Sequence, residues 1–151
     1  MSTRLNNFQA HLAKNNPNFN VNKNSANVRV ARKNINKRNV SATFKNNSGG
    51  NTLTVQTLST NNAYKGRGYQ KAFVKAAENA ARKAGYKRLN ATSIYIIMPW
   101  NNKLPTNKNE PNSYHIFTKL GFKVVSTKGK RGVYQVNSKN RYSVYLNKNL
   151  I

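Results

Sequence analysis

Residues 64–73 read YKGRGYQKAF, a basic loop with two glycines that leads into a helical pattern. Apolar residues recur at helical spacing from Tyr69 to Ala84, and Gly85 then provides a typical helix end. Glycines let a backbone approach a ligand closely, and successive N–H groups at the start of a helix attract anions. The sequence therefore predicts a helix over residues 69–84 whose first turn binds an anion. An ordinary basic turn before a helix is the alternative interpretation.

The segments on both sides of this helix predict one domain of alternating strands and helices. Before it we expect a helix, a polar loop and three strands, over residues 3–14, 15–24, 28–33, 40–45 and 53–58. After it we expect a strand, a loop, a helix and three strands, the middle one short, over residues 87–98, 99–111, 112–120, 122–126, 133–136 and 141–146. We divide the chain into an N-terminal part, a ligand-binding core and C-terminal strands, at residues 1–51, 52–126 and 127–151.

The spacing of apolar residues also predicts which side chains face the core. In the first helix these are Leu5, Phe8 and Leu12. In the strand over residues 53–58, alternation places Leu53, Val55 and Thr57 on one face. In the helix over residues 69–84 we expect a buried stripe of Ala72, Phe73, Ala76, Ala77, Ala80, Ala81 and Ala84.

The charge balance of the chain excludes several kinds of chemistry. The 151 residues carry 27 Lys and Arg against two acidic residues, a formal net charge of +25. The two acids are Glu78 and Glu110, so a paired-carboxylate site, a two-metal site or an EF-hand is not expected. Without cysteine the chain forms no disulfide, zinc–thiolate site or thiol nucleophile. Two histidines are too few for a convincing metal site, and we expect none.

Such a basic chain favours anionic partners, among them nucleic acid, an anionic assembly surface or an anionic cofactor. No base-reading motif is present, so nucleic acid would be bound through its phosphates. The candidate contacts are the basic clusters Arg29, Arg32, Lys33, Lys37, Arg38, Lys128, Lys130 and Arg131. The start of the sequence has no apolar signal region, and the longest near-apolar run, residues 94–100, is too short to span a membrane. We therefore expect an intracellular or virion-associated protein without a secretion signal.

A second stretch, residues 112–122, reads NSYHIFTKLGF. Together with residues 64–73 it resembles the GNAT N-acetyltransferase superfamily, over residues 52–126. The first stretch is similar to the family's pyrophosphate-binding loop, and the second to its late helix, which ends in Y-x-K-L-G-F. The resemblance implies a GNAT-like α/β fold with a mixed, mainly antiparallel sheet flanked by helices. It also implies acetyl-CoA as cofactor, bound by Lys65, Gly66, Arg67, Gly68, Tyr69, Gln70 and Lys71.

Several positions depart from the pattern that the resemblance implies. Gln70 stands where the family has Gly or Ala, and we expect its side chain to crowd the pyrophosphate. Phe117 replaces a tyrosine that often protonates the leaving thiolate, and a phenyl ring donates no proton. Residues 53–60 offer no glutamate to act as general base. Tyr114 and His115 remain as weak catalytic candidates, although we expect His115 to be a surface or interface residue.

Glu78, in the middle of the predicted helix, is expected to pair with Arg82 four residues later rather than to take part in catalysis. Glu110 stands where the family often has Asn.

These observations lead to three hypotheses of function. The first is a catalytically impaired GNAT-fold protein that serves as a structural or binding component of a large anionic assembly, such as a minor capsid protein of a virion or part of a nucleoprotein. The second is an active acetyl-CoA-dependent N-acetyltransferase that relies on backbone polarisation of the thioester carbonyl. The third is a nonspecific nucleic-acid-binding protein. The high positive charge disfavours the cationic amines that are common acceptors in the family.

Overall fold

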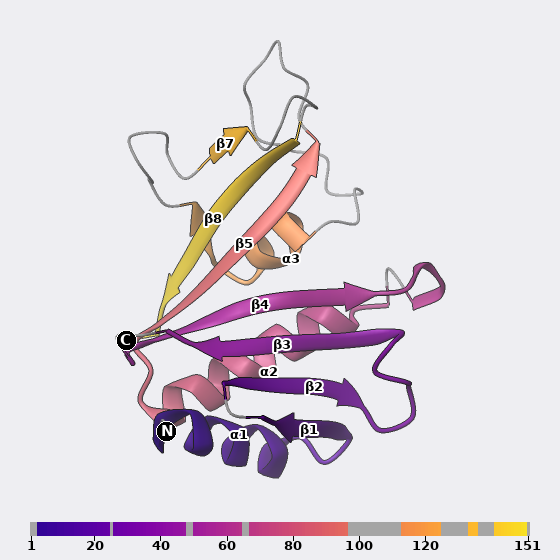
Figure 1. Ribbon diagram of the computed structural model, residues 1–151, viewed down its shortest axis with the longest axis vertical. Coiled ribbons are helices and arrows are strands. Elements are labelled where there is room, and N and C mark those ends of the chain that lie inside the picture. The colour runs from indigo at the N-terminus through magenta and orange to yellow at the C-terminus, as the bar shows by residue number, and fades with distance from the viewer. Residues whose placement is uncertain are drawn as a thin grey trace. The chain divides into compact units, whose positions relative to one another are not determined.

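The computed structural model describes residues 3–24, 26–47, 50–64, 67–96, 113–124, 133–135 and 141–150 (Figure 1). The chain divides into two compact units. The first comprises residues 1–90 and 149–151, and the second comprises residues 91–148.

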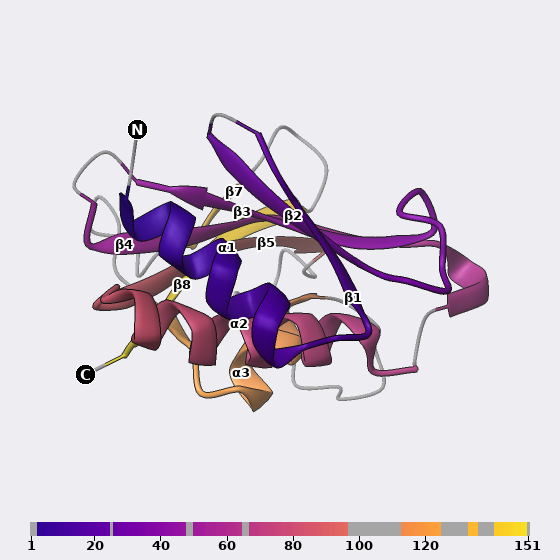
Figure 2. The same cartoon turned by 90° about the horizontal axis from the view of Figure 1, so that it is seen from below.

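The first unit is an antiparallel sheet with helices on one face (Figure 2). Its strands follow one another in space as in sequence: β1 (Phe19–Lys23), β2 (Asn27–Arg32), β3 (Val40–Asn46) and β4 (Thr52–Thr60). The covering helices are α1 (Thr3–Asn15) and α2 (Tyr69–Ala84), and a short 3-10 turn, η1 (Asn62–Tyr64), precedes α2. This arrangement brings the start of α2 close to the β2–β3 end of the sheet.

The core of this unit lies between the two helices and the sheet. Leu5, Phe8 and Leu12 of α1 are buried, which confirms the predicted face of this helix. The ring of Phe8 meets the ring of Phe44 edge-on, with centroids 5.6 Å apart. Phe73 of α2 packs in the same way on Phe19, at 5.1 Å. Aromatic contacts therefore join α1 to β3 and α2 to β1 on the same face of the sheet.

Strand β1 was not predicted, because residues 15–24 were expected to form a polar loop. Phe19 and Val21 are half-buried and alternate with the exposed Asn20 and Asn22. Asparagine is disfavoured in strands, which hid the alternation. Five paired positions with β2, from Phe19 opposite Arg32 to Lys23 opposite Val28, override this preference.

Strand β4 contains an irregularity that changes which residues face the helices. Its register against β3 passes from Val55 opposite Phe44 to Thr57 opposite Thr43, so Gln56 is an extra residue in β4. Such a bulge reverses the alternation. Leu58, opposite the buried Ala42, therefore shares the inner face with Leu53 and Val55. The expectation that Thr57 lies on that face is wrong for this reason.

Helix α2 begins and ends where the sequence predicts. Gly85 adopts a left-handed conformation with φ of 93°, and its N–H donates to the Arg82 carbonyl over 3.1 Å. The predicted buried stripe is confirmed at Phe73 and at three alanines, Ala77, Ala80 and Ala81. Ala76 and Ala84 are only partly covered. Ala72 is exposed instead, because Val74 and Gln70 complete the buried face.

The second unit contains the remaining elements. They are most of β5 (Arg88–Ile96), α3 (Ser113–Lys119), β6 (Lys123–Val124), β7 (Val133–Gln135) and β8 (Arg141–Asn149) up to Lys148. The strand order is β5, β8, β6, and β7 also pairs with β8; β6 and β7 run antiparallel to β8. The expected loop over residues 99–111 lies outside the described residues. Among the helices described, none is both long and apolar enough to cross a membrane.

Candidate functional site

The start of α2 is an open helix N-terminus. Gly68 precedes the helix in a left-handed conformation with φ of 81°, and no described side chain caps it. No described atom lies within 4 Å of the place that a Cβ on Gly68 would take. The first hydrogen bond of the helix runs from the Ala72 N–H to the Gly68 carbonyl over 3.0 Å. The N–H groups of the three residues between them therefore have no acceptor within the helix, which suits an anion.

Positive side chains surround this helix start, and tyrosine rings support them. The Arg67 guanidinium lies 5.5 Å from the centroid of the Tyr64 ring. The Arg32 guanidinium, from the end of β2, lies 5.3 Å from the centroid of the Tyr69 ring. The two tyrosine rings are themselves 6.3 Å apart. Cation–π contacts of this kind hold guanidinium groups in place without neutralising them, so their charge remains available to a ligand.

Gln70 does not crowd the site, and the expectation that it would is wrong. The side chain is buried, with 7% of its surface exposed. Its Nε2 donates to the Ser59 carbonyl over 2.7 Å, to the Thr60 hydroxyl over 2.6 Å and to the Ser41 carbonyl over 3.2 Å. These bonds fix the first turn of α2 to β3 and β4. The side chain points into the sheet, so it does not cover the helix start despite the bulk of glutamine.

The bulge in β4 supplies a backbone group at mid-strand. Gln56 is exposed, and the peptide of a bulged residue drops out of the ladder with the neighbouring strand. Where a bulged residue leaves its backbone N–H without an acceptor in the sheet, that N–H can polarise a carbonyl oxygen. The strand holds no carboxylate, since residues 52–60 read TLTVQTLST. A side-chain general base is therefore absent from β4.

Position 117, where the resemblance places a proton donor, is buried. Phe117 of α3 is 1% exposed and packs on Phe122, with ring centroids 5.0 Å apart. Tyr114 and His115 belong to α3 by their backbone, while their side chains lie outside the described part of the chain. Whether either acts in catalysis stays a prediction.

The first predicted cluster of nucleic-acid contacts, which the structure describes, does not lie on one face of the sheet. On β2, Arg29 is exposed and lies opposite Asn22 and Thr43, whereas Arg32 lies opposite Phe19 on the face that carries the helices. Alternation along the strand separates these two arginines. The rest of the first cluster, Lys33, Lys37 and Arg38, is exposed in the turn between β2 and β3. The second cluster, Lys128, Lys130 and Arg131, and the loop residues Lys65 and Gly66 lie outside the described residues.

Sequence reasoning missed the roles of two residues at the helix start. Arg32 was a candidate nucleic-acid contact, but it comes from a strand 37 positions before Tyr69, and nothing in the sequence links the two. Tyr64 lies in the quoted loop, but its role as a platform for Arg67 depends on the 3-10 turn. The expected pair on α2 is confirmed, since Arg82 Nη1 lies 3.5 Å from Glu78 Oε2. Among the described residues, no cluster of three or more His, Cys, Asp or Glu could hold a metal ion.

Known structures share this fold at low sequence identity. An aminoglycoside 6'-N-acetyltransferase complexed with coenzyme A is 13% identical, with a TM-score of 0.63 over 85% of this chain and 75% of that one. The aminoglycoside 6'-N-acetyltransferase from Enterococcus faecium is 11% identical, with a TM-score of 0.62 over 97% and 90%. The ribosomal-protein-S18-alanine N-acetyltransferase from Escherichia coli is 12% identical, with a TM-score of 0.55 over 85% and 72%.

The similarity is one of structure alone. No protein-family model and no curated protein matches the sequence. The structural matches span both units, since they cover most of the chain. The chain therefore has the GNAT-like α/β fold that its two motifs predict, with a mixed, mainly antiparallel sheet flanked by helices.

Proposed function

We propose that this protein binds a CoA thioester such as acetyl-CoA at the start of α2, and that it is a poor acetyltransferase or none. The observation that carries the proposal is the burial of Gln70, whose bonds to β3 and β4 leave the first turn of α2 open. The pyrophosphate of the cofactor would face the three N–H groups of this turn. It would also face the side chains of Arg67, Lys71 and the supporting Arg32. The coenzyme A complex of a protein with the same fold supports this assignment.

The residues present fit binding better than catalysis. When bound, acetyl-CoA would supply an activated acetyl group for an amine acceptor. The acceptor must lose a proton and the sulfur must gain one, and such proton transfers by side chains contribute about 10²–10⁴-fold to a rate. This chain offers no carboxylate on β4 and a buried phenyl ring at Phe117. What remains is the backbone at the Gln56 bulge, which could polarise the thioester carbonyl.

Calorimetry near physiological salt tests the binding proposal, with CoA and ATP as reference ligands. We expect acetyl-CoA to bind with a Kd of roughly 10 μM or tighter, which is about −7 kcal/mol, and more tightly than ATP. ATP is the essential control because any chain of this charge attracts polyphosphates. Arg67→Gln should weaken acetyl-CoA binding. Lys14 is an exposed lysine of α1, and Lys14→Gln should leave the binding unchanged. Binding no tighter than that of ATP would overturn the proposal.

A second candidate function is a binding component of a large anionic assembly, such as a virion shell or a nucleoprotein. Glu78 is the only carboxylate side chain among the described residues, and it is 13% exposed and paired with Arg82. The described surface thus carries cations with almost no compensating acid, which favours a polyanionic partner. Sedimentation across a range of salt tests this candidate. A salt-insensitive monomer that captures no anionic partner would contradict it.

A further inference from the structure

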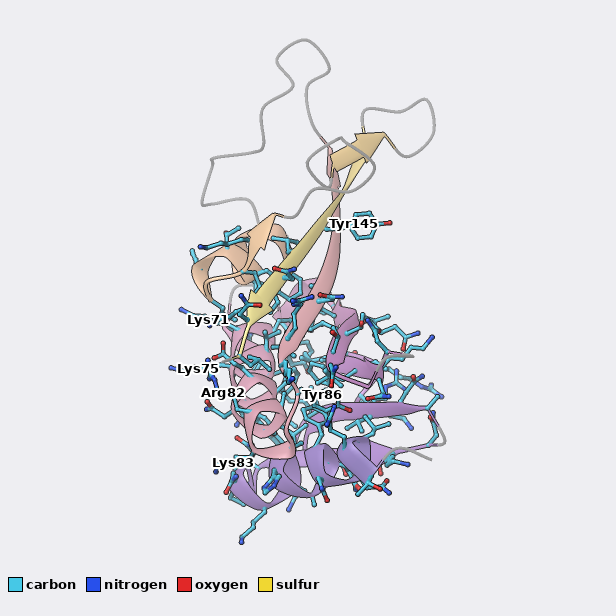
Figure 3. All side chains as sticks on the ribbon, turned by 90° about the vertical axis from the view of Figure 1, so that its left-hand side faces the viewer. Lys71, Lys75, Arg82, Lys83, Tyr86 and Tyr145 are labelled. Atoms are coloured by element: carbon cyan, nitrogen blue, oxygen red, sulfur yellow. The ribbon has the colours of Figure 1, made fainter. Side chains whose placement is uncertain are left out.

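The outward face of α2 carries four cations. Six residues of this fully described helix are exposed, and four of them are basic. The basic residues are Lys71, Lys75, Arg82 and Lys83, and Figure 3 shows them one after another along the helix. We refer to these four residues as the α2 basic face. The site for acetyl-CoA proposed above uses only the first turn, so most of this face has no role yet.

The spacing of the residues in the α2 basic face aligns most of them parallel to the helix axis. Lys71, Lys75 and Arg82 are separated by four and seven residues, which places them in one row along the helix. Lys83 lies beside that row, and the distance from the first to the last residue is about 18 Å at 1.5 Å per residue. A rigid helix therefore presents several charges in a line, where a flexible loop would present them in no fixed order.

Two of the cations have surroundings that favour a bound anion. Arg82 donates from Nε to the Leu150 carbonyl over 3.2 Å and pairs with Glu78, yet its side chain remains 43% exposed. Lys71 lies in the first turn, where a cation opposes the helix dipole at a cost of roughly 0.3–1 kcal/mol. No acidic residue occurs in that turn to offset the cost. A bound anion would relieve this repulsion.

The remaining composition of the face distinguishes between kinds of partner. Its other exposed residues are Ala72 and Asn79, so it carries no large apolar or aromatic side chain. The core of a protein–protein interface is normally apolar or aromatic, whereas nucleic-acid interfaces are polar and strongly basic. Single strands are usually bound by stacking on aromatic rings, which this face also lacks. The basic charge of this face and its lack of apolar and aromatic side chains therefore favour the phosphate backbone of a duplex as its partner.

We propose that the α2 basic face binds the phosphodiester backbone of double-helical nucleic acid without reading its sequence. The proposal rests on the second candidate function above and assigns its polyanionic partner. It places the contact on α2 and not on the turn with Lys37 and Arg38, because the helix holds its cations in a fixed line.

The test is the salt dependence of binding to a mixed-sequence 20-base-pair DNA duplex, measured by fluorescence anisotropy on the full chain. We compare the wild type with the double variant K75Q/K83Q and with a control that removes the same charge elsewhere, K14Q/K45Q. All four lysines are exposed. Each lost phosphate contact lowers the slope of log K against log salt by about 0.9, so K75Q/K83Q should lower it by about 1.8. The control should leave the slope nearly unchanged.

Other outcomes would overturn the inference in identifiable ways. An equal decrease in the salt slope for K75Q/K83Q and K14Q/K45Q would mean that the whole surface attracts DNA. A third double variant, K37Q/R38Q, tests the turn between β2 and β3, and a decrease in that variant alone would place the site there. Poly-glutamate that competes as strongly as DNA would indicate an acidic protein partner instead. A wild type that binds no duplex would overturn this inference, whereas the parent candidate would fall only if sedimentation also showed a salt-insensitive monomer that captures no anionic partner. Unchanged acetyl-CoA binding by K75Q/K83Q, together with an unchanged melting temperature, would show that the cofactor site and the fold are intact.

Discussion

The start of α2 and the positions expected to handle protons differ in what they retain. The helix start has a left-handed glycine, uncapped N–H groups and two guanidinium groups on tyrosine rings. The proton-handling positions have neither acid nor base: β4 holds no carboxylate and Phe117 is buried against Phe122. The described residues therefore retain features that suit an anionic donor, whereas β4 and position 117 offer no group that could move a proton.

The largest effect that the comparison predicts is on acetyl transfer. With saturating acetyl-CoA and a panel of amines, we expect turnover at least roughly 10²–10⁴-fold below that of an enzyme with a positioned acid and base. A quantitative assay of CoA release and acetylated product measures it, with an acetyltransferase that has both groups as the reference and the uncatalysed reaction as the blank. Efficient turnover of any amine would show that a group beyond the described residues supplies the chemistry.

Gln70→Leu should destabilise the first unit and weaken acetyl-CoA binding. The variant leaves the Ser41 and Ser59 carbonyls without this donor, at a cost of about 1–3 kcal/mol. Chemical denaturation measures the free energy of unfolding, and calorimetry measures the binding. If Gln70 instead obstructed the site, a smaller residue would tighten binding, so tighter acetyl-CoA binding by Gln70→Ala would contradict the structure.

Phe117→Tyr should not restore a proton donor. The side chain is 1% exposed, and a buried hydroxyl without a partner costs about 1–3 kcal/mol. We expect a lower melting temperature and no gain in acetyl transfer. A gain in transfer at unchanged stability would show that position 117 faces the reacting groups.

Arg32→Gln should have the smallest effect and only on binding. Loss of the guanidinium held over Tyr69 removes one partly exposed charge near the pyrophosphate, which is worth about 0.2–1 kcal/mol, so acetyl-CoA binding should weaken by about fivefold or less. Arg29→Gln is the matched control, because Arg29 lies on the opposite face of the same strand. Equal weakening by both variants would mean that Arg32 acts only through the net charge.

The sequence was most informative where structure is local. Helix α2 was predicted with its correct limits because its periodicity and Gly85 act within a few residues. Strand β1 was missed because asparagine masks its alternation, and only the partner strand reveals it. The bulge at Gln56 was missed because it is defined by register against β3. The orientation of Gln70 depends on acceptors 10 to 29 residues away, which no local pattern records.

The most direct test of donor binding is a titration with CoA followed by the backbone amide resonances of the ¹⁵N-labelled protein. We expect the largest shifts on Tyr69, Gln70 and Lys71, whose N–H groups lack acceptors within the helix. Resonances at the far end of α2, around Lys83, should move little. Two results would contradict the claim that this helix start binds the acetyl donor. They are shifts that spread over every basic surface, and the absence of any shift in the first turn of α2.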